Sequence, residues 1–256
     1  MVTTPKKKGL SGDTIIKVPM GFKASTGPLN QETPDLPEIL EQVVDRKEFK
    51  IRLADTQGQR SSASMLIKKM YSWRGYQSTF TAEDHPNRIT LVASSEDRTI
   101  GTITIGFDSP IGLLADDLYQ DELTTLRGQG RRLCEFTKLA VDGEIKSKQV
   151  LAALFHIAFI YSFDIQKFTD LLIEVNPRHV KYYERMLGFV SWAETRINRR
   201  VNAPAVLLRL ELGYVRNQIA RFGGKPELAV SEKSLYPYAF SPGEEAGIAN
   251  RLANLS

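Results

Sequence analysis

Hydrophobic and polar residues alternate along residues 47–212 with two distinct periods. Residues 48–56 alternate one by one, as a half-buried strand does, whereas residues 61–77 place apolar side chains three and four positions apart, as an amphipathic helix does. Residues 88–94 and 99–107 are rich in β-branched side chains and are separated by a short polar turn, which predicts a β-hairpin. The first part of this region is therefore predicted as strand, helix, strand, strand.

The second part of the region alternates helices with strands. Its predicted helices are residues 115–130, 148–165 and 177–189, and its predicted strands are residues 132–142, 168–176, 189–199 and 203–212. Strands joined through helices favour parallel neighbours, whereas hairpins at both ends of the region favour antiparallel ones. The pattern predicts an α/β (α+β) fold in which helices cover both faces of a mixed central sheet of about seven strands.

Two segments flank this region. Residues 1–46 combine three lysines with Pro, Gly, Ser and Thr and have few periodic apolar positions, which predicts a flexible N-terminal tail. Residues 213–256 begin with one amphipathic stretch and continue in Gly-, Pro- and Ala-rich sequence, so they form a C-terminal extension that could serve as a lid or a dimer contact. A chain of 256 residues suits one domain with such extensions.

Composition limits the possible partners and cellular location of the protein. The net charge of +4 is only mildly basic, and aromatic residues are not interleaved with basic runs, so we expect no nucleic-acid partner. One cysteine excludes an internal disulfide framework, and the lysines near the N-terminus are not followed by the apolar stretch of a secretory signal, so a cytoplasmic location is expected. The most apolar run, residues 150–163, has 14 residues against the roughly 20 that a membrane-spanning helix needs, which favours a buried helix over a transmembrane segment.

One predicted strand carries an acid and a base in an apolar setting. In the sequence RLCEFTKLAVD, Glu135 and Lys138 are surrounded by Leu, Cys, Phe, Ala and Val. Burying a charge is costly unless the charge is paired or used, so these two residues are candidates for a functional site. Residues three apart lie on opposite faces of a regular strand, and a β-bulge would be needed to change this relationship.

The order of the predicted elements resembles the GNAT acyltransferase fold. In that fold the fourth and fifth strands splay apart, and the pantetheine arm of the acyl donor enters the gap. The corresponding segments here are residues 132–142 and 168–176. The resemblance implies that unpaired backbone N–H and C=O groups along the gap bind the pantetheine amides and polarise the thioester carbonyl.

A narrower resemblance comes from four motifs within residues 49–212. The sequence CEFTKLAV resembles the Glu-x-(Ser/Thr)-(Arg/Lys)-(Leu/Phe)-Ala-Val signature of a branch that takes acyl groups from acyl carrier protein. That branch includes acyl-homoserine-lactone synthases and long-chain N-acyl amino acid synthases. The sequences YSWRGY, GTITIGFDSPIGLLADDLY and IEVNPRHVKYYERMLGF resemble the second group, the FeeM type. The resemblance implies an enzyme that acylates the amine of an amino acid.

Two departures from the common GNAT pattern bear on the donor and on the general acid. The usual (Gln/Arg)-x-x-Gly-x-(Gly/Ala) loop, which holds the pyrophosphate of coenzyme A, is replaced by VDGEIKSKQV, and the partial match RGQGRR precedes the strand and is interpreted as a helix C-cap. This favours the acyl-phosphopantetheine of acyl carrier protein over acyl-CoA as donor, with no permanently bound cofactor. The position of the usual tyrosine general acid is held by Glu184, with Tyr183 one residue away, so the role of Tyr183 is open.

Glu135 is the candidate catalytic base. Beside the gap its pKa can rise toward the working range, so that it takes the proton of the attacking amine directly or through a water. The alternative is a structural carboxylate that is bonded to Lys138 or Arg74. Lys138 in turn either binds the carboxylate of the amino acid or pairs with Glu135.

Further contacts with the acceptor are implied by the resemblance. Trp73, Arg74 and Tyr76 end the first helix, where this branch covers the acceptor site. Arg74 could clamp a carboxylate, or the end of the helix could simply be packed by aromatic residues. Asp108 either holds the ammonium group of the acceptor or is a turn residue that caps the loop of Gly112.

The donor is expected along the gap and just after the fifth-strand segment. Its expected contacts are Leu139, Ala140, Val141, Asn176, His179 and Tyr183. Asn176 precedes a proline, so it could instead be a turn or cap residue. The following residues either frame a basic rim for an acidic carrier protein or are ordinary solvated charges: Arg127, Arg131, Arg132, Lys146, Lys148, Arg178 and Lys181.

The remaining reactive side chains are interpreted as structural. His85 and His156 are expected to have no catalytic role, since His156 lies in an apolar helix. Cys134 lacks the partners of a nucleophile and is expected to be a small buried residue. No group of residues has the spacing of a metal site.

These features predict a cytoplasmic N-acyltransferase that moves a long-chain fatty acyl group from acyl carrier protein to the amine of an amino acid, by direct attack in a ternary complex. An acyl-homoserine-lactone synthase is one alternative, although Lys138 stands where those enzymes usually carry Arg. An acetyl-CoA-dependent GNAT and a non-catalytic module that binds acyl carrier protein or lipid are the others. The amino acid, the acyl chain length and the oligomeric state do not follow from the sequence.

Overall fold

A computed structural model describes residues 14–20, 48–73, 87–143 and 147–254. Its strands are β1 (Ile16–Pro19), β2 (Glu48–Leu53), β3 (Arg88–Ser95), β4 (Arg98–Phe107), β5 (Leu133–Val141), β6 (Asp170–Val175), β7 (Val190–Ser191), β8 (Arg196–Asn198) and β9 (Ala203–Glu211). They form a mixed sheet in the order β1-β2-β3-β4-β5-β6-β9-β7, and β8 also pairs with β9. Neighbouring strands are antiparallel except β5 and β6, which are parallel.

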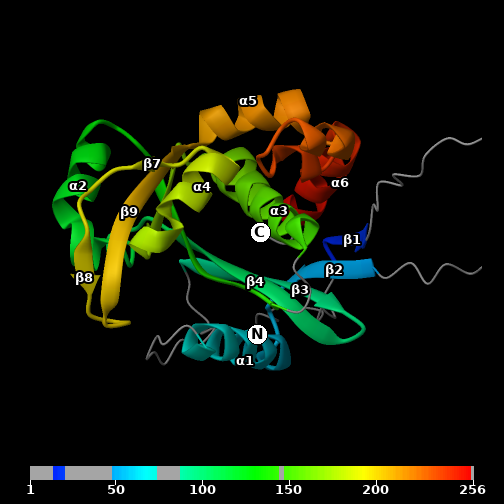
Figure 1. The fold of residues 1–256 in the computed structure, drawn as a ribbon, viewed down its shortest axis with the longest axis horizontal. Coiled ribbons are helices and arrows are strands. Elements are labelled where there is room, and N and C mark those ends of the chain that lie inside the picture. The colour runs from blue at the N-terminus through cyan, green and yellow to red at the C-terminus, as the bar shows by residue number, and fades with distance from the viewer. Residues whose placement is uncertain (1–13, 21–47, 74–86, 144–146, 255–256) are drawn as a thin grey trace, which may run out of the picture.

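Helices cover both faces of this sheet (Figure 1). On one face, α1 (Gln57–Trp73) packs against Ala140 and α2 (Asp116–Gly128) packs against Leu133 and Leu172. The opposite face carries α3 (Lys148–Phe159), its π-helical continuation η1 (Ile160–Ile165), the short 3-10 helix η2 (Pro177–His179) and α4 (Val180–Leu187). The mixed α/β architecture predicted from the sequence is confirmed.

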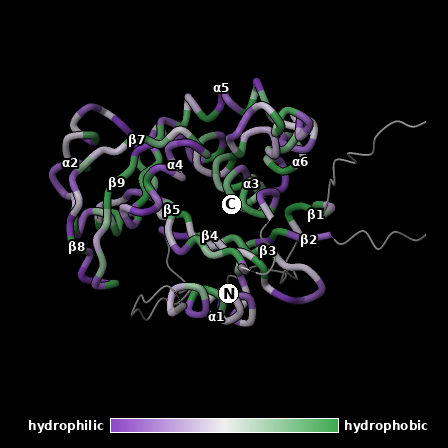
Figure 2. Tube along the Cα trace, in the orientation of Figure 1, coloured by the Kyte–Doolittle hydropathy of each residue, from purple (hydrophilic) through white to green (hydrophobic). Residues whose placement is uncertain are grey.

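The longest apolar segment of the chain is a helix of the protein core. Lys148–Ile165 is the one helix of the described residues that is long and apolar enough to cross a membrane, by length and composition, and 67% of it is buried against the rest of the protein. Its side chains belong to the main hydrophobic cluster, which Figure 2 shows as a concentration of apolar residues around α3 and the neighbouring strands. The sequence-based prediction of a buried helix is confirmed.

The predicted hairpin forms between β3 and β4. Ser95 pairs with Arg98, and the two residues between them, Glu96 and Asp97, have φ angles of 48° and 61°. Two consecutive left-handed residues are what a two-residue type I′ turn requires, and Asp tolerates this conformation better than most residues do.

Three boundaries differ from the sequence-based predictions. Residues 16–19, predicted as part of the tail, form the edge strand β1, in which Ile16 pairs with Ile51 of β2. The first helix begins at Gln57 rather than at residue 61, because Thr56 accepts a hydrogen bond from the backbone N–H of Gln59. The strand predicted at residues 189–199 is divided into β7 and β8, and together with β1 this gives the sheet nine strands instead of about seven.

Most of the C-terminal extension packs onto the core beside α3. It contains α5 (Leu212–Phe222), two 3-10 helices, η3 (Pro226–Val230) and η4 (Tyr236–Tyr238), and α6 (Pro242–Ala253). Tyr236, Phe240 and Ile248 belong to the main hydrophobic cluster. His156 of α3 accepts a hydrogen bond from the backbone N–H of Phe240 through Nδ1 at 2.9 Å, which supports its interpretation as a structural histidine.

Candidate active site

β5 and β6 run side by side for three residues and then separate. They pair from Leu133 opposite Asp170 to Glu135 opposite Leu172. Beyond this point β5 remains paired with β4 and β6 with β9. The splayed strands that the sequence predicted are therefore present, and the gap opens beyond Glu135.

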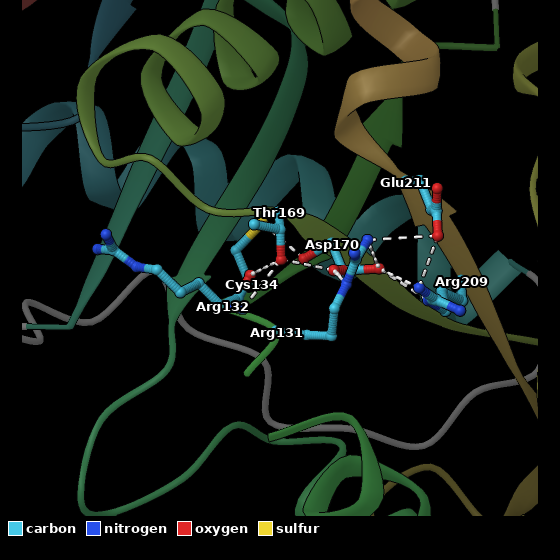
Figure 3. Close-up of polar contacts among 7 residues, drawn as sticks. All are labelled: Arg131, Arg132, Cys134, Thr169, Asp170, Arg209 and Glu211. Carbon is cyan, nitrogen blue, oxygen red and sulfur yellow. Dashed lines mark hydrogen bonds and ion pairs between the residues drawn. The ribbon is translucent and has the colours of Figure 1, made fainter. Parts of the chain in front are cut away.

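A buried ion-pair cluster holds the two strands at their closed end (Figure 3). Asp170, whose side chain is fully buried, accepts hydrogen bonds from Arg131 Nε at 2.5 Å, Arg209 Nε at 2.7 Å and Thr169 Oγ1 at 2.6 Å. Burial alone would raise the pKa of Asp170, but these hydrogen bonds outweigh it and lower the pKa. Because Arg131 lies just before β5 and Arg209 lies on β9, the cluster fixes the point from which β5 and β6 diverge.

A cleft of about 410 Å³ occupies the gap and reaches both faces of the sheet. Its lining includes Tyr71 of α1 and Leu114 before α2 on one face. On the other face it includes Leu151 and Phe155 of α3 and Tyr183 of α4. Two molecules could therefore approach the gap from opposite sides of the sheet.

The cleft brings together most of the residues predicted to bind the donor. Among the predicted residues, those that line it are Lys138, Leu139, Val141, Asn176, His179 and Tyr183. Ala140 points instead toward α1, where it packs against Leu66, Ile67 and Met70. Trp73 is the last residue of α1, and the prediction for its side chain lies outside what the structure describes. Arg74, Tyr76 and His85 also lie outside the described residues.

Glu135 is buried at the closed end of the gap and is not among the residues that line the cleft. Its Oε1 accepts a hydrogen bond from the backbone N–H of Leu114 at 3.0 Å, and its Oε2 accepts one from Ala115 at 3.1 Å. Burial raises the pKa of Glu135 in spite of these hydrogen bonds. Gly106 makes room for the side chain, since a Cβ atom there would lie 2.7 Å from Cγ of Glu135. The structure thus gives Glu135 a supporting role, while its predicted catalytic role is not tested.

The β-bulge that the sequence left open is present at Lys138. On β4 Thr102 and Thr104 are two residues apart, but their partners on β5, Ala140 and Thr137, are three apart. Lys138 has a φ of 52°, a left-handed conformation that is uncommon for residues other than glycine. The extra residue changes the alternation of β5 at the gap and brings Lys138 to the cleft.

Three residues that follow β6 line the cleft, and one of them also caps a helix. Asn176 caps η2, because its Oδ1 accepts a hydrogen bond from the backbone N–H of Arg178 at 3.2 Å. Arg178 Nε donates to Nε2 of His179 at 3.2 Å. Tyr183, rather than Glu184, faces the cleft, and its ring packs edge-on against Tyr182 and Phe189. The donor-binding roles of Asn176, His179 and Tyr183 stay predictions.

Asp108 forms an ion pair outside the cleft lining. Arg127 of α2 donates to both of its carboxylate oxygens at 2.7 and 2.8 Å and also donates to Asp116. Asp108 also accepts a hydrogen bond from the backbone N–H of Ser109 at 3.1 Å, as a turn residue does, while Asp116 contacts the loop at Gly112. The predicted contact of Asp108 with an ammonium group is not tested; in the structure this carboxylate shares the Arg127 guanidinium with Asp116.

Two residues of the predicted basic rim also form ion pairs with carboxylates of the same chain. Arg127 pairs with Asp108 and Asp116, and Arg131 pairs with Asp170. Lys146 lies outside the described residues. Exposed members of the rim are Arg132, Lys148, Arg178 and Lys181.

Polar residues that line the cleft but were not singled out from the sequence include Glu174, Asn198 and Arg200. Glu174 is an acid within the apolar run DLLIEV, so the argument applied to Glu135 could have found it. Asn198 and Arg200 lie on and just after β8, a segment whose irregular path has no simple signal in the sequence. Arg200 Nη2 donates to Glu174 Oε2 at 2.5 Å, and Asn198 Nδ2 donates to the same oxygen at 3.2 Å.

The splayed strands, the flanking helices and the cleft through the sheet define the class of the protein, which is that of the N-acyltransferases with a GNAT fold. The chain belongs to the family described as N-acyl amino acid synthase FeeM, whose family model matches residues 62–211, more than half of the 256 residues. The resemblance proposed from the motifs is therefore confirmed.

The chain is also similar to several solved structures. The structure of FeeM, an N-acyl amino acid synthase from uncultured soil microbes, is 26% identical in sequence, with a TM-score of 0.59, over 66% of this chain and 93% of that chain. The AHL synthase LasI is 13% identical, with a TM-score of 0.48, over 65% and 91% of the two chains. A putative N-acetyltransferase from Lactobacillus plantarum is 16% identical, with a TM-score of 0.47, over 64% and 98%. A search of curated protein sequences finds no significant match.

Proposed function

We propose that the enzyme transfers a long-chain fatty acyl group from the phosphopantetheine of acyl carrier protein to the amine of an amino acid, by direct attack in a ternary complex in the cytoplasm. The observation that carries this proposal is the cleft between β5 and β6, which reaches both faces of the sheet. A thioester and an amine that enter from opposite faces would meet in the gap without an acyl-enzyme intermediate. Holding the two reactants together in this way supplies much of the catalysis that acyl transfer needs.

The face covered by α3 suits a fatty acyl chain. Phe136 of β5 and Phe155 of α3 line the cleft, and both also line a second, apolar cavity between α3, α5 and η4. Their ring centroids are 5.8 Å apart, so the pair separates the two spaces. An acyl chain that fills the cleft would end against this second cavity, which is small at about 30 Å³.

The residues around the gap also include polar groups that suit an amino acid. Lys138 offers a cation for a carboxylate, and Glu174 offers a carboxylate for an ammonium group. Both groups lie beside the splayed strands, where the thioester carbonyl is expected. A zwitterionic acceptor therefore fits the site better than a simple amine or a hydroxyl compound does.

Two features favour acyl carrier protein over coenzyme A as the donor: the RGQG segment is a helix C-cap, and exposed cations lie near the cleft. The sequence RGQG ends α2 with Gly130 at a φ of 75°, and the N–H of Gly130 donates to Arg127 O, so this segment acts as a helix C-cap and not as a pyrophosphate loop. Exposed Lys148 lies at the start of α3, while Arg178 and Lys181 lie in and just after η2, where cleft residues also lie. These cations could attract an acidic carrier protein.

The test is a reconstituted transfer assay. The purified chain is incubated with acyl-loaded carrier protein, the corresponding acyl-CoA, or acetyl-CoA, together with each amino acid in turn, and the products are identified by mass spectrometry. We expect an N-acyl amino acid, formed with a higher kcat/KM from the carrier protein than from either coenzyme A ester. A higher kcat/KM with acetyl-CoA, consumption of S-adenosylmethionine with formation of an acyl-homoserine lactone, or binding of the carrier protein without any product would contradict the proposal.

A further inference from the structure

Glu174, which is partly buried, differs from the two fully buried carboxylates of the splayed strands. Glu135 has a backbone N–H donor on each of its oxygens, and the oxygens of Asp170 are held by Arg131 and Arg209. In Glu174, Arg200 and Asn198 both donate to Oε2, while Oε1 is buried without a hydrogen-bond partner among the described residues. Leaving a buried carboxylate oxygen unpartnered is costly, and Glu174 lines the cleft, so a donor bound there would satisfy Oε1.

The position of Glu174 is the one that an attacking amine would use. Pairing between β5 and β6 ends at Leu172, so Glu174 lies on the open part of β6. Leu172 packs toward α2, and side chains two residues apart share a face of a strand, which places Glu174 on the face covered by α1 and α2. This is the face opposite to Phe155 and the apolar cavity.

Arg200 orients the carboxylate of Glu174 from outside the strand. Its Nη1 donates to Leu114 O at 2.7 Å and to Asp117 at 2.9 Å, which anchors the guanidinium beside α2. Its Nη2 then holds Oε2 of Glu174 at 2.5 Å. Because one oxygen is fixed in this way, the carboxylate cannot rotate freely, and Oε1 keeps a constant place.

The charge state of Glu174 suits proton transfer near neutral pH. Burial raises the pKa of Glu174 to about 7, while Arg200 opposes this and the nearby Glu135 and Asp117 add to it. A carboxylate in this range is partly ionised at neutral pH, so it can both take up a proton and release it again. The charge of Glu135 thus helps to raise the pKa of Glu174.

On these contacts, and on the proposed function, we infer that Glu174 is the catalytic residue that accepts a proton from the amino group of the acceptor, with Arg200 and Asn198 as positioning residues. The nitrogen lone pair forms the C–N bond with the thioester carbon, and the C–S bond breaks with its electron pair on sulfur. Of the three protons of the ammonium group, one stays on the amide, one passes to Glu174 and one leaves with the sulfur as a thiol. Glu174 then returns its proton to solvent.

The test compares pH–rate profiles of Glu174→Gln, Glu174→Asp and Glu135→Gln with that of the unchanged enzyme. We expect kcat/KM of the unchanged enzyme to rise with pH through about 7, because the base must be ionised. Glu174→Gln should lose this rise and lower kcat by about 10²–10⁴-fold. Its KM for the acyl donor should change little. Glu174→Asp should keep the rise with reduced kcat, and Arg200→Gln should move it to higher pH.

A measurement that does not depend on activity accompanies the kinetics. In protein labelled with ¹³C at the glutamate carboxyl carbons, one carboxyl resonance should titrate near neutral pH and be missing in Glu174→Gln, provided that circular dichroism shows both proteins folded. A Glu174→Gln variant that keeps the pH-dependent rise and most of its kcat would refute the inference, as would loss of the rise only in Glu135→Gln. If the unchanged enzyme acylates amines but Glu174→Gln behaves normally, the inference fails and the proposed function stands. An unchanged enzyme without any acyl transfer would overturn both.

Discussion

Arg131 donates two hydrogen bonds to the buried carboxylate of Asp170, from Nε at 2.5 Å and from Nη2 at 3.0 Å. This contact joins the residue that precedes β5 by two positions to the first residue of β6. The strands are therefore tied at one end and free to separate at the other. A cleft between strands needs such a tie, because the backbone groups along the gap give no ladder of hydrogen bonds to hold the sheet together.

The first prediction concerns this tie. Replacing Asp170 by Asn leaves the cations of Arg131 and Arg209 without their buried partner, and removing one member of a buried pair typically costs about 3–5 kcal/mol. We expect a loss of this size in the free energy of unfolding, measured by urea denaturation. Glu211→Gln is the matched control, because Glu211 pairs with the same two arginines but is 56% exposed, and such pairs contribute about 0–1 kcal/mol. Equal losses in the two variants would contradict the role of Asp170.

A second prediction addresses the bulge at Lys138. A β-branched residue is strongly disfavoured at a φ of 52°, so Lys138→Val should destabilise the protein by about 1–2 kcal/mol. Lys138→Gly fits this conformation and should leave the unfolding free energy within about 1 kcal/mol of its original value. Both variants remove the charge, so thermal unfolding distinguishes backbone strain from the loss of a cation. A regular strand at this position would reverse the order of the two variants.

The third prediction concerns the length of the acyl chain. Phe155 lines both the cleft and the apolar cavity, and Phe155→Leu should widen the passage at some cost in stability, because removing atoms from a buried side chain leaves empty space. We expect the distribution of products, measured by mass spectrometry with a mixture of acyl-loaded carrier proteins, to shift toward longer chains. Phe159→Leu is the control, because Phe159 lines the inner cavity but not the cleft. A shift toward shorter chains in Phe155→Leu, or the same shift in both variants, would contradict a role for Phe155 as a gate.

The fourth prediction is a pH dependence of stability that arises in the C-terminal extension. Burial alone would raise the pKa of Glu245, but the neighbouring His156 and Arg216 side chains outweigh it and lower the pKa to about 2. The unfolded chain has an ordinary glutamate and binds a proton first, so this stabilisation is complete above about pH 4.5 and is lost as the pH falls toward 2. The full effect corresponds to roughly 3 kcal/mol.

The measurement for this prediction is urea denaturation between pH 2 and pH 7. Glu245→Gln should be less stable than the unchanged protein at pH 7, and the difference should shrink in acid. Glu244→Gln serves as the control, because Glu244 is exposed and caps α6 through Ser241. A stability difference that stays constant from pH 7 to pH 2 would show that Glu245 does not act through its charge.

The fold could be predicted from the sequence wherever local pattern and tertiary packing favour the same structure. The hairpin at Glu96 and Asp97 and the buried helix after Ser147 are examples, because the turn residues and the N-cap are encoded within a few positions. β1 could not be predicted, since its four residues gain their stability from pairing with β2, far along the chain. The division of β7 from β8 also depends on a contact with a later strand. The Cζ atom of Arg209 on β9 lies 4.5 Å from the ring centroid of Trp192.

The sequence pointed to several residues that line the cleft or lie beside it, but not to Glu174 and Arg200. A charged residue in an apolar strand pointed to Glu135, and the bulge that such a site would need is present at Lys138. The sequence could not show that both carboxylate oxygens of Glu135 accept hydrogen bonds from the backbone of Leu114 and Ala115, because these residues are about twenty positions away along the chain. Glu174 carried the same signal, but its significance depends on Arg200, which comes from a different part of the chain.

Arg251 of α6 donates a hydrogen bond to the carbonyl oxygen of Ile15, so a helix far along the sequence is joined to the residue that precedes the edge strand β1. A chain that lacks α6 also lacks this contact beside the edge strand. An open strand edge invites pairing with other chains. Premature termination upstream of α6 should therefore yield aggregates and not merely a shortened enzyme.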